Sequence, residues 1–151
     1  MITFERTYNA ELAMYFMDYV WDLVSEDDQV IQIPDVVNHV WIKAVIDGQV
    51  ACMFMLHNHY LASWEVHIMC LKEYRKQSRD IARAFISWVF TGIDGCRKLE
   101  TVVPVIYPAV KNFVQTVGFT QEGTKRACYT KSGSLVDVDI FGITQEELTC
   151  Q

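Results

Sequence analysis

Between residues 39 and 105 the pattern of hydrophobic residues changes from that of strands to that of a helix and back to that of a strand. This change limits the possible folds more than any other feature. Two β-rich runs, His39 to Ile46 and Gln49 to Leu56, are separated by the pair Asp47-Gly48. Because Asp-Gly tolerates the positive φ angles of a tight turn, the pair predicts a β-hairpin. The polar segment His57 to Tyr60 is interpreted as the next turn, and Ser63 to Leu71 as a third strand.

A helical segment and a further strand follow this antiparallel unit. From Ser78 to Ile93 the apolar residues fall on one helical face, and Leu99 to Val105 is again β-rich. A strand, a helix and a second strand require a parallel pair joined by a right-handed crossover. The sequence therefore predicts an α+β fold with a central β-α-β unit, flanking helices and a mixed, mostly antiparallel sheet.

The remaining segments complete one domain. No linker rich in Pro, Ser or Gly divides the sequence, and its 151 residues match one ordinary domain, so we predict a single domain over residues 1–151. The other predicted elements are a strand from Ile2 to Arg6, a helix from Asn9 to about Val24, a helix from Pro108 to Gly118, strands from Phe119 to Thr130 and from Leu135 to Ile143, and a capping box from Thr144 to Glu147.

The composition argues against several classes of protein. The formal net charge is −6, and an acidic domain is a poor general partner for nucleic acid, whose phosphates favour Lys and Arg. The five cysteines include no C-x-x-C pair, which favours neither a disulfide nor a zinc framework. The N-terminal residues are charged, and every apolar run is well short of the roughly 18 residues that span a membrane. We therefore expect a cytoplasmic protein without a membrane partner.

Two motifs in the second half of the chain resemble the GNAT superfamily of acyl-CoA N-acyltransferases. The first is the run from Leu71 to Ala82, where a strand leads through a basic segment into a helix. The second runs from Val103 to Phe119 and ends in the Gly-Phe pair that begins the next strand in that family. The order of elements over nearly the whole chain is also similar to GNAT. The resemblance implies a GNAT-like fold and acetyl-CoA as a co-substrate.

A coenzyme A site is implied by the first motif. Amides at a helix N-terminus and cationic side chains both favour a diphosphate. The pantetheine arm of the cofactor would bond to the backbone of Met69, Cys70 and Leu71, where the sheet of this family splits. Tyr107 takes the position of a family Asn and belongs to the same site. The residues that the resemblance assigns to the pyrophosphate are Arg75, Lys76, Gln77, Ser78 and Arg79.

The match to the family pattern has four departures, of which Tyr107 in place of the Asn is one. Ser78 and Asp80 replace two glycines, and a carboxylate at Asp80 would oppose an anion unless it turns away. The Tyr that often protonates the leaving thiolate would fall at Val114. The basic residues Lys72, Arg75, Lys76 and Arg79 form either a local basic patch or a solvated loop, and packing explains Cys70 better than a nucleophilic role.

Candidate catalytic groups lie on the predicted third strand. Strand alternation places Glu65 and His67 on one face, and His67 falls where the family often has a basic Glu. An imidazole can accept a proton from an amine at neutral pH, and Glu65 could orient the ring. The alternative is a hydrogen-bonded strand histidine. We assign no metal to His57, His59, Glu65 and His67, although a metal-dependent activity of this set remains a weaker third reading.

The leading hypothesis is transfer of an acyl group from acyl-CoA to a small-molecule or protein amine, in a monomer or a homodimer. The acidic run Glu26-Asp27-Asp28 is then either a solvated loop or an attractor for that amine. The second hypothesis is a catalytically degenerate GNAT-fold protein. Trp64 to His67, Tyr74-Arg75 and the Gly-Phe pair also resemble a small GNAT-like family of tailed phages, in which some members are labelled head-assembly proteins. In that case it would have a virion, assembly or host-interaction role, in the host cytoplasm.

Overall fold

The computed structural model describes residues 1–150, which form a seven-stranded sheet with the strand order β1-β2-β3-β4-β5-β7-β6. All neighbouring strands are antiparallel except β4 and β5. The predicted α+β class and the mixed, mostly antiparallel sheet are confirmed. The strands are β1 (Ile2–Thr7), β2 (Val40–Ile46), β3 (Gln49–Tyr60), β4 (Ser63–Cys70), β5 (Lys98–Pro104), β6 (Thr120–Lys131) and β7 (Ser134–Thr144).

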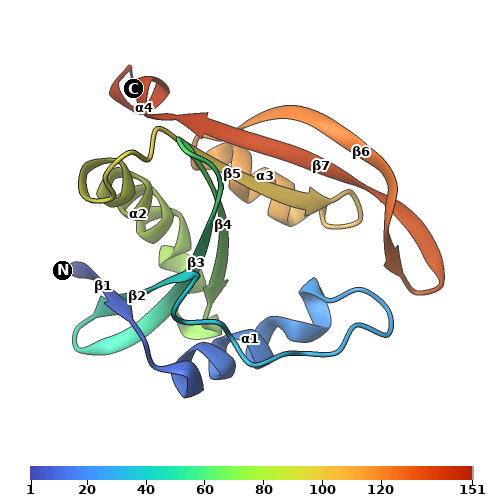
Figure 1. Cartoon of the computed structure of the whole chain (residues 1–151), viewed down its shortest axis with the longest axis horizontal. Coiled ribbons are helices and arrows are strands. Elements are labelled where there is room, and N and C mark those ends of the chain that lie inside the picture. The colour runs from blue at the N-terminus through green and yellow to red at the C-terminus, as the bar shows by residue number, and fades with distance from the viewer. Residues whose placement is uncertain (151) are drawn as a thin grey trace.

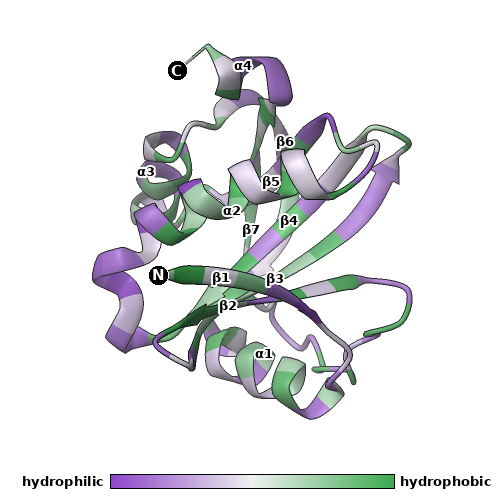
Figure 2. Cartoon of the chain, turned by 90° about the vertical axis from the view of Figure 1, so that its left-hand side faces the viewer, coloured by the Kyte–Doolittle hydropathy of each residue, from purple (hydrophilic) through white to green (hydrophobic). Residues whose placement is uncertain are grey.

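Helices cover both faces of this sheet. Helix α1 (Ala10–Val24) lies on one face, and α2 (Ser78–Gly92) and α3 (Pro108–Thr116) lie on the other, as Figures 1 and 2 show. A short helix, α4 (Gln145–Thr149), follows the last strand. Among residues 1–150, no helix combines the length and the apolar character that crossing a bilayer requires.

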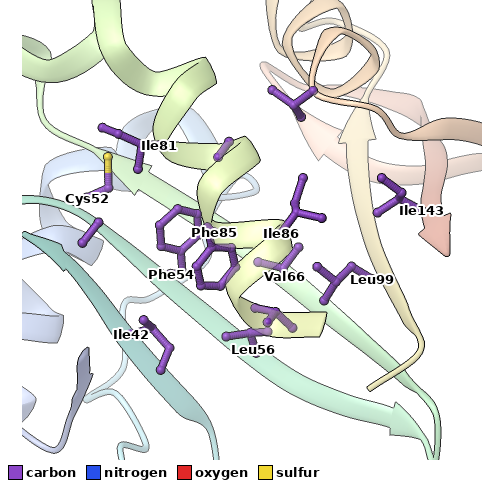
Figure 3. Close-up of a cluster of buried hydrophobic side chains, with 14 of the residues drawn as sticks. Ile42, Cys52, Phe54, Leu56, Val66, Ile81, Phe85, Ile86, Leu99 and Ile143 are labelled. Carbon is purple, nitrogen blue, oxygen red and sulfur yellow. The ribbon is translucent and has the colours of Figure 1, made fainter. Parts of the chain in front are cut away.

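The larger apolar core lies between the sheet and α2. Phe54 of β3 stacks on Phe85 of α2 with a ring-centroid separation of 3.6 Å and an interplanar angle of 6°, and Figure 3 shows the pair at the centre of the core. A smaller core lies under α1, where Phe16 packs against Trp41 and Met69. Because strand side chains alternate, β4 contributes Val66 to the first core and Met69 to the second. The two cores fix both faces of β4, the strand that carries the candidate site.

Local signals account for several element boundaries. Asn9 caps α1 by accepting a hydrogen bond from the Leu12 amide at 3.0 Å. Asp47 and Gly48 both have positive φ, as the predicted hairpin turn requires. The capping box between Thr144 and Glu147 is present at the start of α4.

The predicted turn from His57 to Tyr60 is wrong. Strand β3 continues to Tyr60, and the chain reverses at residues 61 and 62 instead. The polar side chains of this segment resemble a turn in sequence, but cross-strand pairing of His57 with Glu65 and of Asn58 with Trp64 keeps the backbone extended. The histidines therefore lie on a paired strand rather than on a loop.

The basic segment before α2 is not a loop. Lys72–Gln77 forms the 3₁₀ helix η1, which runs directly into α2. The amide of Lys72 donates to the Tyr19 hydroxyl of α1 at 3.0 Å, and the Tyr74 amide donates to Leu71 O. The glycine-poor sequence explains this result, because without glycines the backbone adopts helical angles more readily than an open loop.

Candidate acyl-transfer site

The sheet splits between β4 and β5. The two strands pair in parallel at Ser63, Trp64 and Glu65, and from there they diverge as a V that opens toward the far end of β4 (Figure 1). A cavity of about 630 Å³ occupies this opening. Its size falls within the range of small-molecule and cofactor sites.

The cavity passes from one face of the sheet to the other. His67 lines it from the face of β4 that carries α1, whereas Ile68 and Cys70 belong to the opposite face. Its walls therefore come from helices on both sides of the sheet. The lining residues are Val20, Leu23, Val24, His67, Ile68, Cys70, Arg75, Ser78, Val102, Val103, Pro104, Tyr107, Ala109, Val110, Phe113, Tyr129 and Val138.

Among the residues predicted for the pyrophosphate, Arg75 and Ser78 line the cavity. Lys76, Gln77 and Arg79 are exposed on η1 and on the first turn of α2. The Asp80 carboxylate points into solvent, with 78% of its side chain exposed, and lies 3.8 Å from Arg83. Asp80 therefore does not block the cavity.

The amide of Ser78 is already hydrogen bonded. It donates to Arg75 O, and the Ser78 hydroxyl donates to the same oxygen at 2.7 Å. Both donors of Ser78 are therefore occupied, and a phosphate at this position would meet the Arg75 side chain first.

The backbone of β4 faces the opening at alternate residues. The Leu71 amide donates to Ala51 O at 3.1 Å, so Leu71 directs its backbone groups toward β3. Met69 has the same parity as Leu71, whereas Cys70 and Ile68 have the opposite parity and direct theirs toward the gap. Of the three residues predicted to bond the pantetheine arm, Cys70 thus has the suitable orientation, and Ile68 joins it.

His67 and Glu65 form a carboxylate–imidazole pair. His67 Nε2 lies 2.9 Å from Glu65 Oε1, and the Glu65 side chain is only 13% exposed. This hydrogen bond is the largest cause that lowers the pKa of Glu65. The ionised carboxylate fixes the proton of His67 on Nε2 and leaves Nδ1 as the acceptor. The pair can therefore orient and support a base at the edge of the cavity.

Cys70 has an environment that the sequence does not reveal. It lies opposite Cys52 in the β3–β4 register, and a hydrogen bond from the Cys52 thiol lowers the pKa of Cys70, assisted by the charge of Arg75. The same interaction raises the pKa of Cys52. Arg75 therefore brings positive potential to the cavity beside Cys70.

Tyr129 lines the cavity although no sequence pattern identifies it. A bulge between Lys125 and Tyr129 shifts the register of β6, and Ala127 in this bulge has a φ of 47°. The Asp137 carboxylate accepts a hydrogen bond from the Ala127 amide at 2.8 Å and holds the bulge. Burial, with the proximity of Tyr107, raises the pKa of Tyr129 to about 12. The Tyr129 hydroxyl donates to Val24 O at 3.0 Å, which joins β6 to the end of α1.

The acidic run after α1 is hydrogen bonded to the end of β6 and to the β6–β7 turn, and so it is not a solvated loop. Both carboxylate oxygens of Asp27 accept hydrogen bonds at 2.9 Å, from the amides of Ser132 and Gly133 at the β6–β7 turn. The Glu26 carboxylate accepts a hydrogen bond from the Thr130 amide. These contacts join α1 to the far arm of the sheet across the mouth of the V.

We expect Asp27→Asn to lower the melting temperature by a few degrees at pH 7. The amide hydrogen bonds from Gly133 and Ser132 hold the pKa of Asp27 below its usual value, so the carboxylate stabilises the fold above the unfolded-state pKa of about 3.9. That contribution is lost as the pH falls through the lower folded-state pKa. Melting curves between pH 7 and pH 3 should therefore show a difference that shrinks below about pH 4. Asp28→Asn is the matched control. An equal loss in both variants would contradict a specific stabilising role of the Asp27 hydrogen bonds.

The seven-stranded sheet, the split between β4 and β5 and the helices on both faces define the GNAT fold, the architecture of acyl-CoA N-acetyltransferases. The structure is similar to that of spermidine N-acetyltransferase from Vibrio cholerae in complex with CoA and spermine, with a TM-score of 0.79, 16% identity and coverage of 98% of each chain. It is also similar to a GNAT-family acetyltransferase from Streptococcus pneumoniae, with a TM-score of 0.72 and 16% identity over 95% of this chain and 99% of that one. At the level of sequence, no protein-family model and no curated protein matches the chain.

Proposed function

We propose that this protein transfers an acyl group from acyl-CoA to the amine of a small molecule. The observation that carries the proposal is the cavity of about 630 Å³ at the split between β4 and β5. It opens to both faces of the sheet, so two substrates can approach each other from opposite sides. Bringing two reactants into one site in this way supplies much of the rate enhancement of a bimolecular transfer.

The cofactor side of the cavity is the face covered by α2 and α3. Arg75 would bind the pyrophosphate there, joined by the Ser78 hydroxyl once it turns away from Arg75 O, and the backbone of Cys70 and Ile68 would bond to the pantetheine arm. The apolar walls from Val103 and Phe113 would exclude water around the arm. The acyl carbonyl would then lie in the split, close to His67.

His67 would act on the acceptor amine. Its Nδ1 accepts a proton as the amine nitrogen attacks the thioester carbonyl carbon, while Glu65 stabilises the imidazolium that forms. The tetrahedral intermediate then collapses, the C–S bond breaks, and the CoA thiolate leaves. The products are an amide and CoA.

Tyr107 would give the proton to the leaving thiolate. Residue 114, where the family often has this acid, is a buried Val, and the Tyr129 hydroxyl already donates to backbone oxygens at the end of α1. Tyr107 is the N-cap residue of α3 and lines the cavity. Its side chain therefore lines the site from the start of the helix rather than from its middle, and its hydroxyl interacts with that of Tyr129.

The acceptor class that we propose is a small aliphatic amine. The neighbouring Vibrio cholerae enzyme is a spermidine N-acetyltransferase and binds spermine, so polyamines are the first acceptors to test. On the α1 side, the ionised Glu65 offers the negative charge that would attract a cationic amine.

Steady-state release of free CoA thiol from acetyl-CoA tests this proposal, with spermidine, spermine and a lysine-containing peptide as separate acceptors. We expect saturable release that depends on both acetyl-CoA and an amine, with a polyamine preferred to the peptide. The occupied amide of Ser78 favours the competing view of a non-catalytic GNAT-fold protein. No amine-dependent thiol release with any acceptor would support that view.

A further inference from the structure

Three of the four histidines of the chain surround Glu65 on one face of the sheet, and the fourth, His39, lies beside His57. His57 pairs directly with Glu65 across β3 and β4, and the ring of His39, just before β2, lies 5.6 Å from the ring of His57. His59 and His67 each lie two residues further along their strands and so share this face. The clustering depends on the extension of β3 to Tyr60, which the sequence does not reveal.

Three of these histidines direct a ring nitrogen at the Glu65 carboxylate. The distance to Oε1 is 2.9 Å from His67 Nε2 and 3.7 Å from His57 Nε2, and the distance to Oε2 is 3.2 Å from His59 Nε2. Ligand atoms of His57, Glu65 and His67 all lie within 4.8 Å of one another. Ligands around a tetrahedral zinc ion lie about 3.3 Å apart, given bonds of roughly 2.0–2.1 Å, so the observed spacings bracket that value.

The cluster also has the outer contacts that a metal site needs. His59 Nδ1 faces Glu100 Oε2 at 3.6 Å, so the carboxylate of β5 can hold the ring with Nε2 toward Glu65. Glu100 is fixed in turn by Lys98 at 3.4 Å. The side chains of His57 and His67 are 25% and 39% exposed, which leaves a path for an ion from solvent.

We propose that His57, Glu65 and His67 form a binding site for a divalent transition-metal ion such as Zn²⁺, and that His59, which lies outside this group of three but 3.2 Å from Glu65 Oε2, turns in as the fourth ligand. Three neutral imidazoles and one carboxylate suit a first-row ion of this kind rather than Mg²⁺ or Ca²⁺, which prefer oxygen ligands. Binding of the ion rests on the geometry of this sheet face alone, whereas its effect on acyl transfer also rests on the proposed function. It revises our reading of the sequence, which assigned no metal to these residues.

Metal in the site would compete with acyl transfer. Glu65 and His67 Nε2 would both bind the ion, so the His67 proton would lie on Nδ1, the nitrogen that would otherwise accept the proton of the amine. Zn²⁺ would therefore act as a reversible inhibitor of the transferase, and a chelator would restore the activity.

Titration of the full chain with Co²⁺ tests the site, because Co²⁺ replaces Zn²⁺ and absorbs visible light strongly in tetrahedral coordination. The protein should carry no affinity tag, and Cys128→Ser with Cys150→Ser should remove the two exposed thiols, which also bind such ions. We expect a tetrahedral spectrum that saturates at one Co²⁺ per chain and is abolished by Zn²⁺. A spectrum of hydrated Co²⁺ alone would overturn the proposal.

The variants His57→Gln and His59→Gln locate the ion. Each should weaken Co²⁺ binding by more than the roughly 10–100-fold that loss of an outer-shell partner costs, whereas His39→Gln should leave binding within a few-fold of the parent. Equal binding by the parent and both ligand variants would overturn the site. With a chelator present, acetyl-CoA should raise the melting temperature of these variants as much as that of the parent. Loss of metal binding can therefore be distinguished from loss of acetyl-CoA binding.

Discussion

Replacing His67 with Gln is expected to reduce the turnover number by about 10²–10⁴-fold, the usual contribution of a positioned general base. Gln can still donate a hydrogen bond to Glu65, so the carboxylate keeps a partner, but it has no acceptor nitrogen that can take the proton of the amine. The measurement is thiol release from acetyl-CoA under saturating amine, with a chelator present to remove bound metal. The rise in melting temperature with acetyl-CoA should be unchanged, because His67 lies on the α1 face of β4, the side that we propose for the acceptor.

The control for this experiment is His39→Gln. It removes a histidine from the same cluster, but His39 lies just before β2, with its ring 5.6 Å from that of His57. We expect turnover to stay within a few-fold of the parent. A His67→Gln protein that retains full turnover would show that the base is another group or water, and would remove His67 from the mechanism.

Replacing Arg75 with Ala is expected to weaken binding of acetyl-CoA by roughly 10–100-fold, because a hydrogen bond to a charged group contributes about 1.5–3 kcal/mol. Arg75 lines the cavity and is close enough to Cys70 to lower the pKa of that thiol. Calorimetric titration with acetyl-CoA measures the change in Kd. The binding should also weaken as salt rises, since the contact is ionic.

Lys76→Ala is the matched control, because Lys76 is the next cation along η1 and is exposed like Arg75 but does not line the cavity. Its removal should change the Kd by less than about threefold, in line with the small contribution of exposed ion pairs. Equal effects of the two substitutions would indicate a diffuse basic surface instead of a specific diphosphate contact at Arg75.

The sequence predicts the fold well where local signals and tertiary contacts agree. Asp47-Gly48 forms the predicted turn, and Asn9 forms the predicted cap. The polar segment from His57 to Tyr60 fails as a turn because its strand conformation depends on pairing with β4, which no short window of sequence contains. The basic segment forms η1 rather than a loop because it lacks the glycines that would keep it open.

For the site, the resemblance and strand alternation identify residues on the central β-α-β unit and little beyond it. Five predicted residues, His67, Cys70, Arg75, Ser78 and Tyr107, line the same cavity. Tyr129 and Val24 meet there from positions 105 residues apart, through a bulge that redirects β6. Such a contact depends on the tertiary arrangement of β6 and α1, and neither Tyr129 nor Val24 has a sequence pattern that predicts it.

The proposed acyl transfer requires that the split between β4 and β5 takes up the pantetheine arm of acyl-CoA. A titration of the isotope-labelled protein with CoA, followed by amide chemical shifts, tests this claim directly. We predict saturable binding, with the largest shifts at the Cys70 and Ile68 amides and smaller shifts along β2. The absence of any shift at millimolar CoA, or saturable binding that leaves the amides of β4 unperturbed, would contradict it.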